Sequence, residues 1–286
     1  MRTISIAWVG PLFVLVWSTG FIVAKYGMPY TDPMTFLSMR FAGVLVIMVP
    51  LSLWWRPSWP TGRSMVHIAI AGLLMHVGYL GGVWSAIKLG MPAGLSALIV
   101  GLQPVLTAFL AARLAEKVTP RQWAGLIFGF SGVAIVLADK LGFDGVTFLG
   151  VSLCFIALIS FTMGTIYQKR FCPMFDLRAG TMIQYAASLV VSGLLMLALE
   201  PMTVSWTGEL IGALIWSVVF LSIGAMSLWF VLLRQGAATR VSSLIYLTPA
   251  TVAVMAWILF DEALSLWVAI GTLVTVIGVW LVTRAK

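Results

Sequence analysis

Residues 148–168 read FLGVSLCFIALISFTMGTIYQ, a run of 21 positions that contains no charged side chain. A helix needs about 20 apolar residues to cross roughly 30 Å of hydrocarbon, so this run is long enough to span a bilayer. Nine further runs of the same character fill most of the chain. The ten candidate spans are Ile4–Lys25, Met34–Trp54, Met65–Ile87, Pro92–Arg113, Gln122–Ala138, Phe148–Gln168, Ala179–Leu199, Leu210–Leu233, Val241–Phe260 and Leu266–Thr283. The sequence therefore predicts an all-α polytopic membrane protein with ten transmembrane helices.

The composition agrees with this prediction and excludes several classes of function. The 286 residues are 61% hydrophobic and 9% charged, with a mean hydropathy of +1.07, whereas about a quarter of a soluble domain is charged. The net charge of +8 does not indicate nucleic-acid binding, because the basic residues lie at the span ends rather than in one patch. The expected partners are the lipid bilayer and a small-molecule substrate, with no nucleic acid.

The basic residues are distributed very unequally between the two sides that ten spans define. Thirteen of the 17 fall on the side of the termini, Lys25, Lys88 and Lys140 fall on the opposite side, and Arg40 lies within a span. Because positive charge accumulates in cytoplasmic loops, both termini are predicted to be cytoplasmic. The acidic residues assigned to the outside are Asp32, Asp139, Asp144, Glu200, Glu209, Asp261 and Glu262. We expect a multi-pass protein of a bacterial inner membrane.

The second half of the chain repeats the first at an offset of 144 to 146 residues. The matching segments occur in the same order: Trp17-Ser18-Thr19-Gly20 with Phe161-Thr162-Met163-Gly164, Lys25 with Lys169, Arg40-Phe41-Ala42 with Gln184-Tyr185-Ala186, Gly78 with Gly224, Lys88 with Arg234, Leu102-Gln103-Pro104 with Leu247-Thr248-Pro249, and Glu116 with Glu262. Five spans is an odd number, so the second half enters the membrane upside down. We predict two inverted five-helix repeats, residues 1–140 and 145–286, an architecture typical of alternating-access transporters with a substrate site near the midplane.

Several of these motifs resemble the EamA family of the drug/metabolite transporter superfamily. They are Val16-Trp17-Ser18-Thr19-Gly20-Phe21 with Lys25, the Arg40-Phe41 pair, and the series Pro104, Glu116, Gly125 and Gly132. The resemblance covers the whole chain and implies movement of small metabolites, often amino acids or their derivatives and frequently outward. Small four-helix multidrug members of the superfamily carry an essential glutamate in their first helix. The first span here has no carboxylate, so that proton-coupling scheme does not carry over. A proton gradient, exchange or the solute gradient alone stay open as energy sources, as does the oligomeric state.

Arg40 is the polar residue whose position within a span most needs an explanation. Placing an arginine near the bilayer centre costs at least about 2.5–3.5 kcal/mol. Three interpretations follow: a ligand for a substrate carboxylate or other anion, one partner of a gating ion pair, or a structural arginine that binds backbone carbonyls or snorkels outward. Its counterpart in the second half is Gln184, which is neutral, so the two half-sites differ in charge.

Other polar residues at similar depth are candidates to line the same cavity. His76 lies at the centre of the third span and shares a helix face with Tyr79, three residues on; it lines a cavity, carries protons, or is a neutral histidine bonded to a neighbouring helix. Trp17 is too deep for the interfacial aromatic belt and is interpreted as the wall of a pocket. The predicted substrate-binding set is Trp17, Ser18, Arg40, His76, Tyr79, Gln103, Gln184 and Tyr246.

Two further patterns concern helix shape and packing. Pro104 and Pro249 lie at the centres of the fourth and ninth spans, where a proline removes a backbone hydrogen bond and kinks the helix. They are interpreted as gate hinges, with a fixed kink as the alternative. Small residues recur at helical spacing in the fifth and tenth spans and predict close packing of these two helices. They are Gly125, Gly129 and Gly132, and Gly271, Thr275 and Gly278.

These features favour a secondary transporter that alternately opens one cavity to the two sides. The first alternative is a passive channel, although no ring of like residues suits a selectivity filter. The second is an intramembrane enzyme or an assembly subunit, for which a catalytic pair at one depth is missing. The sequence has no metal-ligand cluster and no nucleotide-phosphate loop, so we expect no enzymatic activity, no cofactor and no metal.

Overall fold

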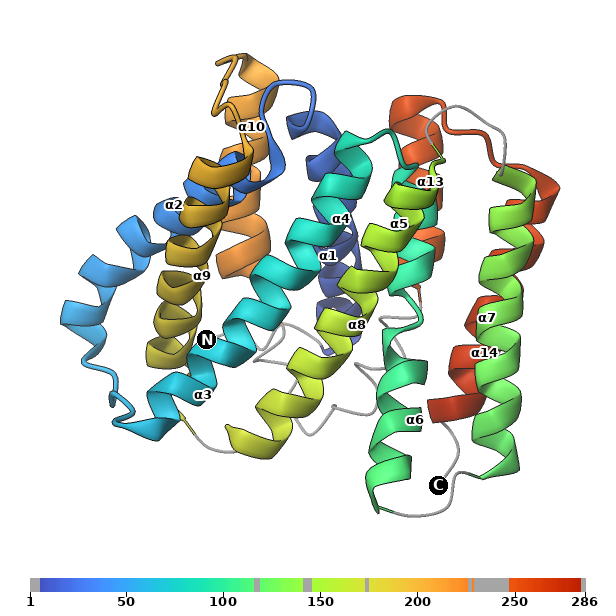
Figure 1. The fold of residues 1–286 in the computed structure, drawn as a ribbon, viewed down its shortest axis with the longest axis horizontal. Helices are drawn as coiled ribbons and strands as arrows, with labels where there is room; N and C mark the ends of the chain where they lie inside the picture. Colours follow the sequence, from blue (N-terminus) through green and yellow to red (C-terminus); the bar gives the residue numbers. More distant parts are fainter. Residues whose placement is uncertain are drawn as a thin grey trace.

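The computed structural model describes residues 6–115, 119–140, 146–172, 175–225, 228 and 247–283, and within these ranges it contains helices and loops but no strand. The elements, drawn in Figure 1, are α1 (Ile6–Gly27), α2 (Pro33–Trp55), α3 (Arg63–Gly72), the π-helical segment η1 (Leu73–Gly78), α4 (Tyr79–Lys88), α5 (Ala93–Val100), α6 (Gln103–Ala115), α7 (Pro120–Lys140), α8 (Phe148–Phe171), α9 (Leu177–Leu199), α10 (Gly208–Trp216), the π-helical segment η2 (Ser217–Ala225), α13 (Thr248–Phe260) and α14 (Leu266–Thr283).

The observed helices follow the predicted apolar runs closely. α14 spans the same residues as the predicted tenth span, and α2 extends the second by one residue at each end. Within the described part of the chain, seven helical stretches are long and apolar enough to cross a membrane. They are Val9–Gly27, Pro33–Trp54, Arg63–Lys88, Pro120–Asp139, Phe148–Phe171, Leu177–Leu199 and Gly208–Ala225. Shorter apolar helices lie at Ala93–Thr107, Thr248–Phe260 and Leu266–Leu281.

The fourth span departs from the prediction of one helix kinked at Pro104. The chain leaves α5 after Val100, turns at Gly101 and Leu102, and begins a new helix, α6, at Gln103. Pro104 is therefore the second residue of α6, where its missing N–H needs no helical partner. Pro249 likewise lies in the first turn of α13. Neither proline kinks a helix from within, because each occupies the first turn of one.

The turn at Gly101 lies directly against the first turn of α13. A Cβ atom on Gly101 would lie 2.7 Å from Pro249 Cγ, so only a glycine permits this approach. α5 and α13 also pack along their lengths, next to each other in Figure 1. The starts of α6 and α13 therefore lie close together, although they are about 145 residues apart in the sequence. Each of these two helices has a proline in its first turn.

α7 and α14 form the closest helix pair and stand side by side in Figure 1. A Cβ atom on Gly132 would lie 2.4 Å from the Gly271 carbonyl oxygen, and one on Gly278 would lie 2.6 Å from that of Gly125. Thr275 Oγ1 lies 3.5 Å from the Gly129 carbonyl oxygen. The predicted packing of the fifth and tenth spans through small residues is confirmed.

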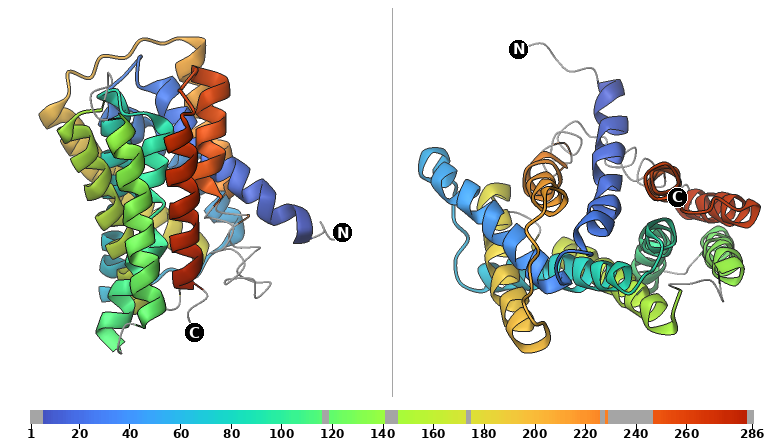
Figure 2. Two further views of the ribbon diagram at one scale, coloured as in Figure 1. Left: turned by 90° about the vertical axis from the view of Figure 1, so that its right-hand side faces the viewer. Right: turned by 90° about the horizontal axis from the view of Figure 1, so that it is seen from above.

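Two more pairs build the rest of the bundle. α2 packs along α9, and α4 packs along α8, which runs beside the continuous rod of α3, η1 and α4 (Figure 1). Seen from above, α1 extends away from the other described helices toward its N-terminal end (Figure 2). The opposite end of α1 reaches the centre of the bundle, where Phe21 and Ile22 join a core with Phe36, Phe41 and Tyr185.

The close glycine contacts between α7 and α14 predict that adding one methyl group at this interface destabilises the protein. Gly132→Ala should lower the free energy of unfolding by about 1–3 kcal/mol, because the methyl group overlaps the facing backbone. The measurement is the thermal unfolding midpoint of the purified protein in detergent. The matched control is Gly193→Ala in α9, where a Cβ atom meets nothing within 4 Å, so the midpoint should stay unchanged or rise. Equal midpoints for the two variants would contradict this packing.

Candidate functional site

Arg40 lies seven residues into α2, about 10 Å along its axis, and only 6% of it is exposed. Its Nε donates a hydrogen bond to Ser222 Oγ of η2 over 3.1 Å, and Tyr185 and Tyr79 lie within electrostatic range of the guanidinium. Among the described residues, no carboxylate comes within ion-pair distance of Arg40. The buried positive charge therefore faces hydroxyl groups rather than negative charge.

The π-helical segment η2 presents the hydroxyl that Arg40 contacts. Ser222 Oγ donates to the Ser217 carbonyl oxygen, five residues earlier, over 3.0 Å, so its lone pairs remain for Arg40 Nε. π-helical turns are rare and often occur at functional sites, because they widen the helix and redirect its side chains. The other such segment in the described chain, η1, carries His76. Both segments thus deliver a polar side chain to the same region.

Aromatic rings enclose the guanidinium on the side of α9. The His76 ring stacks on Tyr185 with centroids 4.7 Å apart, and Phe41 lies 5.6 Å from Tyr185 and 6.0 Å from His76. Tyr79 stacks on Phe161 of α8 at 4.5 Å. We call Arg40, Phe41, His76, Tyr79, Gln184, Tyr185 and Ser222 the Arg40 cluster.

Gln184 completes the cluster from α9 and is tightly held. Its Nε2 donates to Gln168 Oε1 over 3.1 Å, and His76 lies near its side chain. A Cβ atom on Gly72 would lie 2.6 Å from Gln184 Cβ, so α3 approaches α9 closely at this point. Gln184 is thus held by a hydrogen bond to Gln168 and by close packing against Gly72.

The structure brings together four residues of the predicted binding set, Arg40, His76, Tyr79 and Gln184. The other described positions of the set make different contacts. Gln103 donates to Thr107 and Thr165, Trp17 packs on Phe13 and beside Ala225, Ser18 is fully buried with an unpartnered Oγ in the described structure, and Tyr246 lies outside the described residues.

The predicted binding set lacks three residues of this region. Tyr185 and Gln168 were not predicted to line a site, although Tyr185 follows Gln184 and corresponds to Phe41 in the repeat. Ser222 was not in the set either. A π-helical turn has no sequence signature, so the position that makes Ser222 matter could not be read in advance.

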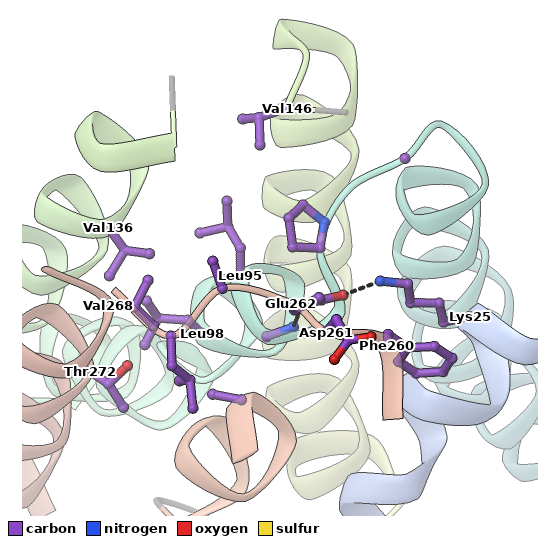
Figure 3. Close-up of a pocket in the computed structure, with 16 residues that line it drawn as sticks. Lys25, Leu95, Leu98, Val136, Val146, Phe260, Asp261, Glu262, Val268 and Thr272 are labelled. Carbon is purple, nitrogen blue, oxygen red and sulfur yellow. Dashed lines mark hydrogen bonds and ion pairs between the residues drawn. The ribbon is translucent and has the colours of Figure 1, made fainter. Parts of the chain in front are cut away.

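A second polar arrangement lies at the end of the bundle that the charge count assigns to the outside. Glu262 forms an ion pair with Lys25 of α1 and accepts hydrogen bonds from the backbone N–H groups of Ala93 at 3.0 Å and Gly94 at 3.3 Å. Lys25 Nζ also lies 4.7 Å from the centre of the Phe260 ring. One carboxylate thus joins α1, the first turn of α5 and the loop after α13 (Figure 3).

These residues border a cavity of 270 Å³. Figure 3 shows its polar side, with Lys25, Asp261 and Glu262, and its apolar side, with Leu95 and Leu98. α5, α7, α13 and α14 all contribute to the lining. The cavity wall is therefore polar on one side and mainly apolar on the other.

Other contacts at both ends join residues that the charge count places on one side. Lys88 lies 3.5 Å from Asp32 and donates to the Met28 and Thr31 carbonyl oxygens. At the opposite end, Asp176 bonds Arg178 over 2.7 Å and accepts from the Ser58 N–H. Its bonds to Arg178 lower the pKa of Asp176 to about 2. The contacts agree with the predicted threading of the chain.

Comparison with known proteins identifies the family. The model of the EamA-like transporter family matches residues 4–138 and again residues 148–284. The chain is 28% identical to the uncharacterized transporter YvbV of Bacillus subtilis (strain 168), over 96% of this chain and 90% of that one. It is 28% identical to the uncharacterized inner membrane transporter YedA of Escherichia coli (strain K12), over 97% and 90%.

A third relative has a more specific name. It is a probable amino-acid metabolite efflux pump of Escherichia coli (strain K12), 26% identical over 94% of this chain and 92% of that one. A crystal structure matches with a TM-score of 0.67 over 98% of both chains at 19% identity, which shows a shared fold. The buried polar cluster, the apolar helices and a family match over nearly the whole length agree: the chain is a multi-pass membrane protein that belongs to the EamA-like transporter family.

Proposed function

We propose that the protein is a secondary transporter that moves a small anionic or zwitterionic metabolite, such as an amino acid or a derivative, out of the cell. The observation that carries the proposal is Arg40, a buried guanidinium without a carboxylate partner among the described residues. A charge in this position is expensive unless something compensates it. A substrate carboxylate would supply two acceptor oxygens that match the guanidinium fork. The printed name of the efflux-pump relative supports this class of substrate.

The proposed architecture is ten spans arranged as two inverted repeats, residues 1–140 and 145–286, with both termini in the cytoplasm of a bacterium. Three observations support it. The family model matches the chain twice in tandem, α7 packs on α14, and α2 packs on α9. Each of these helix pairs joins corresponding spans of the two halves. The Arg40 cluster draws its residues from both halves, as a site at a repeat interface requires.

In this mechanism Arg40 anchors the carboxylate, and Tyr185 and His76 offer ring faces to the rest of the substrate. Ser18, with its unpartnered buried hydroxyl, and Trp17 extend the site along α1, and Gln103 and Tyr246 extend it toward the fourth and ninth spans. The helix starts at Pro104 and Pro249 act as hinges. Either a proton gradient or exchange drives the flux, and counterflow measurements distinguish the two.

The Glu262 network closes the outer side in this proposal. It joins Lys25 of the first half to a loop of the second, and it holds the first turn of α5 at the same time. Opening the cavity outward requires these bonds to break together. The Lys88–Asp32 pair lies on the same side but within the first half only, so it does not have to break.

Arg40→Gln tests the anion site. In proteoliposomes, flux of amino acids should fall at least about tenfold, because a hydrogen bond to a charged group contributes about 1.5–3 kcal/mol. Flux of the corresponding decarboxylated amines should not fall. The thermal unfolding midpoint should stay equal or rise, since an expensive buried charge is removed.

The control variant is Arg40→Lys, which keeps the charge but loses the planar fork and should retain part of the flux. Saturation and counterflow of the wild-type protein separate a transporter from a passive channel. Equal losses for amino acids and amines, together with a lower unfolding midpoint, would show that Arg40 is structural.

Lys25→Met tests the outer closure. In a background where Cys154 and Cys172 are replaced by Ala, a cysteine at Leu98, in the cavity wall, reports outward opening by its reaction with a membrane-impermeant maleimide. Loss of an ion pair worth about 1 kcal/mol should raise the labelling rate about fivefold. Lys88→Met is the matched control, because its partners all lie in the first half, and it should leave the rate unchanged. The same rate change in both variants would refute the closure.

A further inference from the structure

Corresponding residues of the two halves meet in the Arg40 cluster. Arg40 corresponds to Gln184 and Phe41 to Tyr185, both at an offset of 144, and His76 corresponds to Ser222 at an offset of 146, the offset of Gly78 and Gly224. The contacts follow the same correspondence. Arg40 of α2 bonds Ser222 of η2, and His76 of η1 stacks on Tyr185 of α9, the residue that follows Gln184. Each half therefore places a side chain of its π-helical segment against a helix of the other half.

The approximate twofold axis that relates the halves passes through this cluster. Phe41 and Tyr185 are counterparts and lie 5.6 Å apart; a residue contacts its own counterpart only beside the symmetry axis, as in an isologous interface. Gly129 and Thr275 are a second pair of counterparts in contact, at 3.5 Å. Arg40 and Gln184 are the neighbours of Phe41 and Tyr185 in the sequence, so they occupy equivalent places on either side of the axis.

The two places differ in chemistry. On one side, Arg40 carries a positive charge and bonds Ser222 through Nε, while its terminal nitrogens bond no carboxylate among the described residues. On the other side, Gln184 is neutral and its amide Nε2 donates a hydrogen bond to Gln168 Oε1. The cluster thus has one cationic half and one neutral half around a common axis.

We infer that Gln184 is a specificity-determining residue, and that its neutrality restricts the site to solutes with a single carboxylate. The inference rests on the proposed anion site at Arg40. A second carboxylate on the solute would lie opposite Arg40, beside Gln184, where the described residues supply no cation. Burying an unpaired carboxylate is costly, so dicarboxylates are rejected by the missing charge rather than by size.

The Gln184→Arg substitution tests this inference. Gln and Arg share Cβ, Cγ and Cδ, so Gln184→Arg keeps the close contact with Gly72. The double variant Arg40→Gln/Gln184→Arg moves the charge to the symmetry-related place. The matched control is Arg40→Gln/Gln122→Arg, which places the same new charge on a glutamine of α7 that bonds Thr119 and lies outside the proposed site.

Affinities are measured by thermal-shift titration of each purified full-length variant, since a ligand stabilises the state it binds. The probes are leucine, methionine and phenylalanine, with one carboxylate, and aspartate and glutamate, with two. Wild-type protein should favour the single-carboxylate probes at least about tenfold, which corresponds to about 1.4 kcal/mol. Gln184→Arg should gain at least about tenfold for aspartate and glutamate. The double variant should regain most of the affinity that Arg40→Gln loses, and the Gln122 control should not.

The outcomes separate this inference from the function on which it rests. If Arg40→Gln weakens binding but Arg40→Gln/Gln184→Arg restores none of it, position 184 does not determine specificity and only the inference fails. If Arg40→Gln binds every probe as the wild type does, or the wild type binds none, the anion site itself is refuted. Should Gln184→Arg fail to purify as a single species, Gln184→Lys carries the charge in each arm.

Discussion

A guanidinium inside hydrocarbon, bonded to a serine hydroxyl rather than to a carboxylate, is the constraint around which this protein is organised. Lipid offers such a group no partner, so the helices around it must supply every contact. α2 brings Arg40, η2 brings Ser222, and α9 brings Tyr185. These elements come from both halves of the chain, so the charge is buried only when the halves are assembled. A feature that costs folding free energy in this way is typical of a functional site.

The closest helix packing among the described residues lies elsewhere, between α7 and α14. Helices in a bilayer gain little from hydrophobic burial, so close backbone contact and dispersion must hold them together. Gly132, Gly271 and Gly278 bring the two backbones within reach of each other. This pair has no member of the Arg40 cluster. Close glycine packing between α7 and α14 is thus separate from the polar Arg40 cluster. This separation suits the proposed transporter, in which the helices around the substrate must move relative to the rest of the bundle.

Hydropathy was sufficient to place the helices, because apolar length is a direct requirement of the bilayer. It also located Arg40, His76 and Gln184, since polar residues in apolar runs are few. Three features could not be predicted from hydropathy. The end of α5 before Gln103 depends on the contact of Gly101 with Pro249, and the π-helical segments depend on packing. The ion pair of Lys25 with Glu262 joins residues that are 237 positions apart in the sequence. Depth along a helix is readable from sequence, whereas the direction of a side chain is set by neighbouring helices.

The helix starts at Gln103 and Thr248 have one more consequence. α13 is 13 residues long and ends at the outer rim, so its first turn lies about 20 Å deep, and α6 begins at comparable depth after the eight residues of α5 and a short turn. The amino end of a helix carries a partial positive charge. Two such ends therefore lie within the bilayer rather than at its surface, where their partial charges favour an anion over a cation. In the proposed transport mechanism, these two helix starts would favour the passage of a carboxylate.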